Sequence, residues 1–296
     1  MGAGLAEVVT YAFSDPARAD LLRRPADPKP VELMNPLARD ASLLRTHPLE
    51  GVLSAVATNV RRQQADVRVF EVGKVYQWGN GDTGTSEPRW VAIALTGGRG
   101  EAGWSATPEP VDVYDAKGLA EHVLAALAVR AGTGGAGALS GFEPDCHGTL
   151  VAESGAILAE FGEVAAALRE SFGIAAPVFA AVVSLDAIVA TSVAPLRYQP
   201  LPRFPAVERD LAFVIGAEQT LTAAQIEAAL GEEAGPLLRR LVLFDVFRFP
   251  DGRSSLAWRL LFQAEDRTLT DAEVNAIQER VVRRITETFH ITLRST

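Results

Sequence analysis

The sequence divides at Arg197-Tyr-Gln-Pro-Leu-Pro-Arg-Phe-Pro-Ala-Val-Glu-Arg-Asp-Leu-Ala-Phe-Val-Ile215. Each of its three prolines fixes its own φ and pushes the preceding residue toward extended geometry, which excludes a helix. The apolar run at the end, Leu211 to Ile215, has the length and residue types of a buried strand. A stiff segment that leads into a new first strand is typical of a domain boundary. We therefore expect one domain at 1–196, a proline-rich linker at 197–205 and a second domain at 206–296.

Length and composition favour a soluble protein with two hydrophobic cores. The chain has 296 residues, of which 48% are hydrophobic, and this is enough for two domains. The sequence contains no apolar run of about 18 residues and no signal peptide, so we expect no membrane contact and a cytoplasmic location. Its single cysteine, Cys146, excludes an internal disulfide and a thiolate metal cluster.

The charge distribution limits the kinds of partner. A net charge of −9 argues against a protein that coats nucleic acid non-specifically, because phosphate binding depends on accumulated positive charge. After residue 199, however, all 12 cationic residues are Arg and none is Lys. Arg stacks on bases and pairs with phosphate in two places at once, so RNA contact by the second domain remains possible. GC-rich coding also favours Arg over Lys, and we favour this explanation of the composition.

The first domain shows a mixture of helical and strand patterns. Apolar residues recur at helical spacing over 48–62 and 115–129, whereas strand-like runs occupy 68–76, 91–95 and 178–185. Helices interspersed with an antiparallel-looking sheet predict an α+β fold.

Candidate catalytic residues are scarce in this domain. It has no Gly-x-x-x-x-Gly-Lys loop and no His-x-x-x-His pair, and a lone histidine is more often structural than a ligand. Asp112, Asp115 and Glu121 have a spacing that fits a cation site. The same spacing fits a helix N-terminus, where acids complement the helix dipole, and we favour this second interpretation.

The second domain has the order β-α-β-β-α-β, which is the ferredoxin-like arrangement. Its strands are predicted at 211–215, 240–249, 255–262 and 291–293. Capping boxes begin both helices, because Thr222 precedes Gln225 by three residues and Thr270 precedes Glu273 in the same way.

Alternation of side chains assigns the two faces of this second sheet, of which the two helices can cover only one. We expect the helices to cover Val242, Phe244 and Val246. The open face would then display Leu243, Asp245, Phe247, Phe249, Ser255, Ala257 and Arg259. An aromatic ring, an acid, a hydroxyl and an arginine on one face suit a nucleobase, since the ring stacks and the polar groups read an edge. A surface that packs against the first domain or a partner protein would fit these residues equally well.

Several short motifs in the first domain occur in an order that resembles the beta subunit of bacterial phenylalanyl-tRNA synthetase. The motifs are Glu7-Val-Val-Thr-Tyr-Ala-Phe13, Met34-Asn-Pro-Leu37, Ser42-Leu-Leu-Arg45, Phe70-Glu-Val-Gly73, Trp104 and Val111-Asp-Val-Tyr-Asp-Ala-Lys-Gly118. In that family this region is a catalytic-like module with the class II synthetase fold, and it packs against the catalytic alpha subunit of a heterotetramer without doing chemistry.

An inactive module agrees with the residues present. Amino acid activation by class II synthetases needs an Arg in a Phe-Arg-x-Glu setting and another in a Gly-x-Gly-x-x-Arg setting, because the transition state gathers negative charge. Near Phe70-Glu71 the nearest candidate, Arg68, is out of step, and nothing fits the second setting. We expect no catalytic residue, cofactor or metal in this chain, while the whole synthetase would use ATP and magnesium.

The second domain resembles the anticodon-binding domain of the same family. The matching segments are Pro205-Ala-Val-Glu-Arg-Asp-Leu-Ala-Phe213, Phe244-Asp-Val-Phe247, Ser255-Leu-Ala-Trp258 and Arg267-Thr-Leu-Thr-Asp271. The resemblance implies that Phe247 stacks on the anticodon of phenylalanine tRNA, with Asp245 and Ser255 nearby; Arg259 lies on the same predicted face. Phe247 stands where Tyr is usual, which keeps the stacking ring but removes the hydroxyl.

The resemblance covers nearly the whole chain, yet the chain is much shorter than a full beta subunit, and we interpret it as a carboxyl-terminal fragment. The alternative is a protein-interaction module whose second domain binds protein or a small effector and never contacts RNA.

Overall fold

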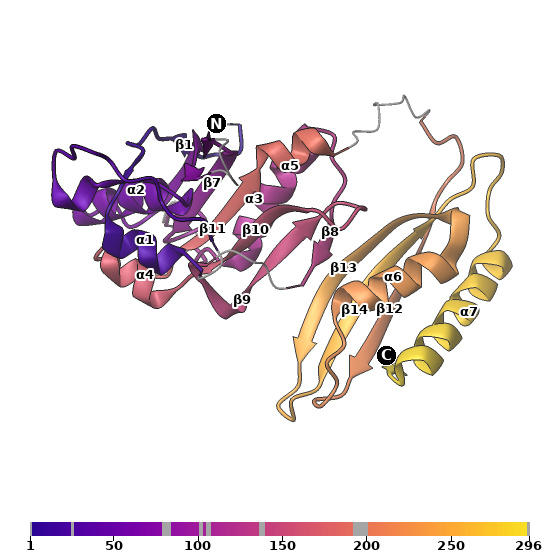
Figure 1. The fold of residues 1–296 in the computed structure, drawn as a ribbon. Helices are drawn as coiled ribbons and strands as arrows, with labels where there is room; N and C mark the ends of the chain where they lie inside the picture. The colour runs from indigo at the N-terminus through magenta and orange to yellow at the C-terminus, as the bar shows by residue number, and fades with distance from the viewer. Residues whose placement is uncertain are drawn as a thin grey trace. The chain divides into compact units, whose positions relative to one another are not determined.

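The computed structural model describes residues 2–24, 27–78, 84–100, 103–104, 108–135, 140–191 and 201–294 (Figure 1). Contacts divide the chain into two compact units, Met1–Leu196 and Arg197–Thr296. The first residues of the proposed linker, 197–200, lie outside the described residues, so the linker stays a prediction.

A seven-stranded sheet forms the centre of the first unit, in the order β1-β4-β7-β11-β10-β9-β8. These strands are β1 (Ala6–Glu7), β4 (Val67–Lys74), β7 (Arg89–Thr96), β11 (Phe179–Ser184), β10 (Ile157–Val164), β9 (Phe142–Val151) and β8 (Gly132–Gly134). The β1–β4 pair is parallel, and every other neighbouring pair in this sheet is antiparallel. The predicted α+β class, with an antiparallel sheet, is confirmed.

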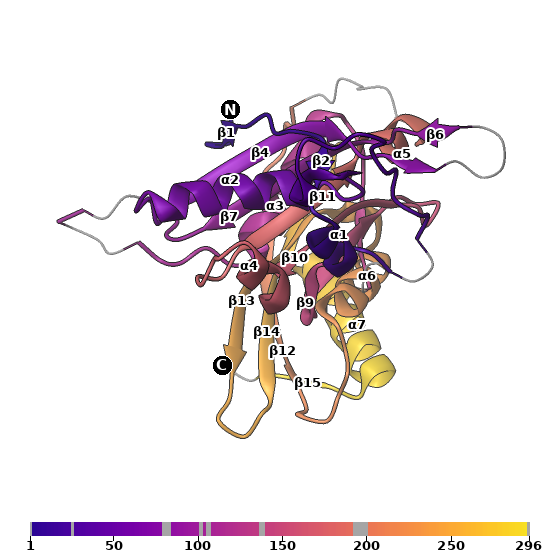
Figure 2. The ribbon, with the colours of Figure 1, turned by 60° about the vertical axis from the view of Figure 1, so that its left-hand side comes forward.

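Helices bury both faces of this sheet (Figure 2). On one face lie α2 (Leu49–Arg61) and α4 (Ala166–Ser171), and on the other lie α3 (Val113–Ala126) and α5 (Leu185–Ala190). The shorter elements are β2 (Phe13–Ser14), α1 (Pro16–Leu22), η1 (Arg39–Ala41), β3 (Leu43–Leu44), β5 (Gln77–Trp78) and β6 (Thr85–Ser86). Because β7 is covered on both sides, its sequence is a continuous apolar run rather than an alternating one.

The acids near the start of α3 cap that helix. Asp112 is its N-cap and accepts hydrogen bonds from the backbone N–H groups of Tyr114 and Asp115, in a capping box completed by the Asp115 side chain. Arg99 pairs with both acids, and Glu121 pairs with Lys117 one turn earlier in the helix. The interpretation as a helix N-terminus is therefore confirmed for Asp112 and Asp115, whereas Glu121 lies in the middle of the helix.

The second unit is a four-stranded antiparallel sheet in the order β13-β14-β12-β15, with two helices packed on one face. Its elements are β12 (Val207–Ile215), α6 (Ala223–Ala234), η2 (Gly235–Leu237), β13 (Leu238–Arg248), β14 (Ser254–Phe262), α7 (Asp271–Phe289) and β15 (Thr292–Leu293). Thr222 and Thr270 form the two predicted capping boxes. The ferredoxin-like arrangement is confirmed.

An irregularity in β13 overturns part of the predicted face assignment. Leu243 lies opposite the buried Trp258 and packs into the core, although it was expected on the open face. The register then shifts, so that Asp245 rather than Phe244 lies opposite Ala257. One extra residue in a strand changes which side chains face the core, and simple alternation does not anticipate this.

The same irregularity corrects the placement of Val242 and Phe244. Val242 lies opposite Arg259, whose side chain is on the open face, and the Phe244 ring lies beneath the Arg259 guanidinium at 4.8 Å. Both residues were predicted under the helices, and both belong to the open face. Val246 lies opposite the buried Leu256, on the face that was predicted, but it is 52% exposed.

No helix in the described part of the chain is long and apolar enough to cross a lipid bilayer.

Candidate nucleic-acid interface

Two aromatic rings and an arginine gather at one end of the open face of the second unit. Phe247 and Phe249 meet edge to face, with 5.0 Å between ring centroids. The guanidinium of Arg294 lies 5.7 Å from each centroid, within the range of a cation–π contact. Phe247 is 47% exposed, so a large part of its surface remains open to solvent.

Small residues leave room for Arg294 to cross the sheet. Its backbone N–H donates to the carbonyl of Ala212 at 2.8 Å, which continues the pairing of β15 with β12. Ala212 lies opposite Ala257 on the next strand, and Ala257 lies opposite Asp245. Because no bulky side chain stands on this row, the long Arg294 side chain reaches the two rings.

Asp245 presents a free carboxylate beside this cluster. Asp245 is exposed, and its side chain forms no hydrogen bond or ion pair within the residues that the structure describes. Phe247 is two residues after Asp245 in β13 and lies opposite Ser255. The ring and the acid therefore lie on the same face, as the sequence predicted, and an unpaired carboxylate can accept hydrogen bonds from the amino group of a base.

Ser255 occupies the predicted position but is nearly inaccessible. It lies between Phe247 on β13 and Val214 on β12, and only 2% of its surface is exposed. A ligand would reach its hydroxyl only after neighbouring side chains move.

Arg259 belongs to a second group on the same face. Its Nε and Nη2 donate to the two carboxylate oxygens of Asp210 at 2.9 and 2.7 Å, and Glu208 lies 3.9 Å away. The hydrogen bonds between Arg259 and Asp210 raise the pKa of Arg259 and lower the pKa of Asp210. Its charge is thus already balanced, and its guanidinium covers Phe244 rather than Phe247.

Positive charge at the aromatic end comes from residues that sequence reasoning did not select. Arg294 is exposed and has no ion pair in the described part of the chain. Arg253 pairs with Asp251 at 2.8 Å and also lies over the Phe249 ring, 5.1 Å from its centroid. If the alternation of side chains in the predicted strand at 291–293 is continued by one residue, it places Arg294 on the open face. The sequence therefore contained a signal for this residue.

Arg68, the nearest candidate for the arginine of the Phe-Arg-x-Glu setting, lies in the first unit. Arg68 is on β4, and its Nη2 donates to the carbonyl oxygen of Gly98 at 2.8 Å. This guanidinium is therefore bound to the backbone just after the neighbouring strand, β7.

Two family models match the chain. The model described as the phenylalanyl tRNA synthetase beta chain CLM domain matches residues 1–185, and the ferredoxin-fold anticodon binding domain matches residues 202–294.

Curated relatives agree with these matches. The Phenylalanine--tRNA ligase beta subunit of Symbiobacterium thermophilum is 35% identical to this chain, over 94% of this chain and 32% of its own length. The beta subunit of Moorella thermoacetica is 36% identical, over 99% of this chain and 37% of its own length. The subunit of Anaeromyxobacter dehalogenans is 35% identical over 99% of this chain and 37% of its own length. The chain thus spans about a third of the length of these relatives.

Among solved structures, a pyrrolysyl tRNA synthetase, Desulfitobacterium hafniense PylSc, aligns with 64% of this chain and 63% of its own, with a TM-score of 0.46 and 15% identity.

Proposed function

Because the chain belongs to the family of phenylalanine-tRNA ligase beta subunits, we propose that its second unit binds the anticodon loop of phenylalanine tRNA. The first unit would dock on the catalytic alpha subunit, so that the pair supports ATP-dependent aminoacylation in the cytoplasm. ATP and magnesium would act in the alpha subunit, and this chain would supply no catalytic residue.

The aromatic cluster on the open sheet face carries the RNA part of the proposal. An exposed ring with a free acid and an unpaired arginine beside it offers a base a stacking surface, an acceptor and a cation. In this proposal a base stacks on Phe247, and Asp245 accepts a hydrogen bond from its edge. Ser255 and Arg259 remain predicted members of the site. The burial of Ser255 limits its contact with RNA, and the ion pair with Asp210 limits that of Arg259.

Arg294 would act as the cation of this site. A planar guanidinium that already lies against Phe247 and Phe249 can stack on a base or pair with its phosphate after a small movement. Replacement of the usual Tyr by Phe247 leaves stacking intact and removes a hydroxyl, so polar recognition would fall to Asp245 and Arg294.

A titration with a fluorescent anticodon stem-loop of phenylalanine tRNA tests the assignment. Phe247→Ala should weaken binding by roughly 1–3 kcal/mol, the usual range for one stacked base. Phe244→Ala is the matched control, because Phe244 is on the same strand and face and is 48% exposed against 47% for Phe247. Equal losses in both variants would contradict the placement of the base at Phe247. Failure of the wild-type chain to bind would instead favour the protein-interaction alternative.

Exposed apolar side chains support the docking part of the proposal. Met34 and Leu37 are fully exposed in one short segment of the first unit, and in this proposal the alpha subunit covers them. A Met34→Ser/Leu37→Ser variant should lose co-elution with the alpha subunit from the same source in size-exclusion chromatography. Val189→Ser, which changes a 75% exposed side chain on α5, should retain it.

A further inference from the structure

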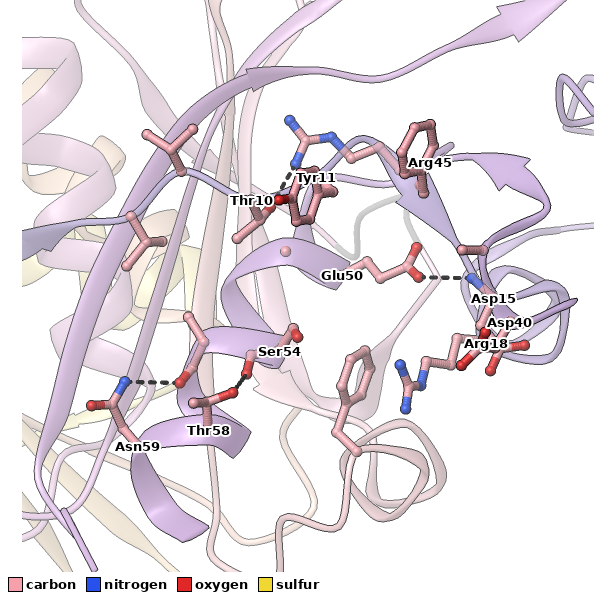
Figure 3. A pocket seen from close by; sticks show the side chains of 17 residues that line it. Thr10, Tyr11, Asp15, Arg18, Asp40, Arg45, Glu50, Ser54, Thr58 and Asn59 are labelled. Carbon is pink, nitrogen blue, oxygen red and sulfur yellow. Dashed lines mark hydrogen bonds between the residues drawn. The ribbon is translucent and has the colours of Figure 1, made fainter. Parts of the chain in front are cut away.

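An open groove of about 600 Å³ lies in the first unit (Figure 3). One wall is the segment 8–13, and the other is formed by α2. Its volume is within the range of small-molecule sites, roughly 300–1,000 Å³. In Figure 3, Glu50 is joined to Asp15, with Tyr11, Arg18 and Ser54 around the same space.

Glu50 lines this groove as a buried acid without a counter-ion. Only 7% of its surface is exposed, and its carboxylate accepts hydrogen bonds from the Ser14 hydroxyl at 2.6 Å and the Asp15 backbone N–H at 3.3 Å. Within the described residues no cation lies at ion-pair distance from it. Burial raises the pKa of Glu50, although the hydrogen bonds from Ser14 and Asp15 act in the opposite direction.

Two arginines, Arg18 and Arg45, line the same groove, and neither pairs with Glu50 within the described residues. The guanidinium of Arg18 lies 4.3 Å from the ring centroid of Phe172, and its Nη2 donates to the carbonyl oxygen of Ser171. It influences Glu50 only at longer range. The buried carboxylate therefore retains acceptor positions for a donor that comes from outside.

A second buried acid nearby shows the contrast. Glu71 pairs with Arg45 at 2.9 Å, and both side chains are almost fully buried. Arg45 also donates to Thr10 and to the carbonyl oxygen of Lys74, so it is committed to this network. Among the residues that the structure describes, Glu71 has a cationic partner and Glu50 does not.

The other residues that line the groove suit a ligand with a cationic group and an aromatic or apolar part. Tyr11, Phe13 and Phe172 contribute aromatic rings, and rings attract cations as well as apolar groups. On α2, the Asn59 amide donates to the Ala55 carbonyl, which leaves its oxygen as a further acceptor.

We propose that this groove binds a small primary amine with an aromatic or apolar body, whose ammonium group pairs with Glu50. The ammonium would supply the counter-ion that Glu50 lacks among the described residues, and the body would lie against the rings. The inference concerns only the first unit and does not depend on RNA binding by the second.

Isothermal titration of the full 296-residue chain with phenethylamine tests this proposal. The neutral analogue 2-phenylethanol has a similar size and ring but no charge, so it should bind about ten- to a hundredfold more weakly. Glu50→Gln should reduce phenethylamine affinity by a similar factor. Glu153→Gln, which removes an exposed acid elsewhere in the same unit, should leave the affinity unchanged.

Three results would overturn the proposal: no binding of phenethylamine to the wild-type chain, equal binding of the amine and the alcohol, or unchanged affinity in folded Glu50→Gln. Should Glu50→Gln fail to fold, the comparison of amine with alcohol on the wild-type chain decides the role of charge by itself. A parallel stem-loop titration separates this outcome from the RNA proposal.

Discussion

Arg45 and Glu71 form a buried ion pair in the first unit, with 2.9 Å between Nη1 and Oε1 and side chains 7% and 5% exposed. Thr10 joins the pair, since its hydroxyl and backbone N–H both donate to the Glu71 carboxylate. Arg45 is at the end of β3 and Glu71 is on β4, so the network ties the start of α2 to the central sheet.

Removal of Arg45 should destabilise the first unit strongly. Arg45→Met leaves the Glu71 charge buried without a counter-ion, and loss of one partner of a buried pair costs about 3–5 kcal/mol. Replacement of both residues, as in Arg45→Met/Glu71→Leu, should recover a large part of this loss because no charge is then stranded. Urea unfolding measures both values; a double variant no more stable than Arg45→Met would contradict the ion-pair explanation.

Two glycines make room for the same network. A Cβ at Gly51 would collide with the Thr10 hydroxyl and a Glu71 carboxylate oxygen, and a Cβ at Gly73 would collide with Nη2 of Arg45. These side chains are held by buried hydrogen bonds, so they can yield only by breaking them. We expect Gly51→Ala and Gly73→Ala each to cost about 2–4 kcal/mol.

Gly118→Ala is the control for those glycine variants. Gly118 lies within α3, and no atom of the described residues is within 4 Å of the position its Cβ would take. Alanine there should stabilise the helix by roughly 0.5–1 kcal/mol, as it does in an open helix interior. Gly51 is also in a helix, α2. If Gly51→Ala were stabilising too, the Thr10 and Glu71 side chains would be able to move away from the new Cβ at little cost, and our explanation would be wrong.

Local sequence patterns predict some features of this fold, such as helix caps, but not features that depend on long-range contacts. Capping boxes at Thr222 and Thr270 were predictable because each depends on residues three apart. The irregularity that moved Leu243 and Phe244 between faces was not, since no glycine or proline marks it. A contact such as Arg45–Glu71 joins residues 26 apart and becomes visible only when the sheet is assembled.

His47 should make the first unit sensitive to acid. It is 3% exposed, its Nδ1 accepts a hydrogen bond from the Leu49 N–H, and burial lowers its pKa to about 4. Unfolded histidine has a pKa of about 6.5, so between pH 6.5 and 4 the unfolded chain binds the proton and the folded chain does not. The free energy of unfolding should therefore fall as pH decreases through this window, by about 3 kcal/mol from this residue.

Urea unfolding at pH 7.5 and at pH 5 measures the effect. His47→Gln should lose this part of the pH dependence, whatever its stability at pH 7.5, because glutamine does not titrate. His122→Gln, an exposed position on α3, should keep the wild-type dependence. If His47→Gln shows the same loss between the two pH values as wild type, the acid sensitivity has another source.

Arg294 should contribute to RNA binding through both charge and stacking. Its guanidinium contacts Phe247 and Phe249, and it has no acidic partner in the described part of the chain. Arg294→Ala should weaken binding of the anticodon stem-loop by about 1–2 kcal/mol and reduce the salt dependence of the affinity. Arg294→Lys should restore the salt dependence more than the affinity, because a lysine keeps the charge but not the planar group. Arg283→Ala, which removes an equal charge from the exposed surface of α7, is the control. An equal loss in Arg283→Ala would assign the effect to net charge and not to the aromatic cluster.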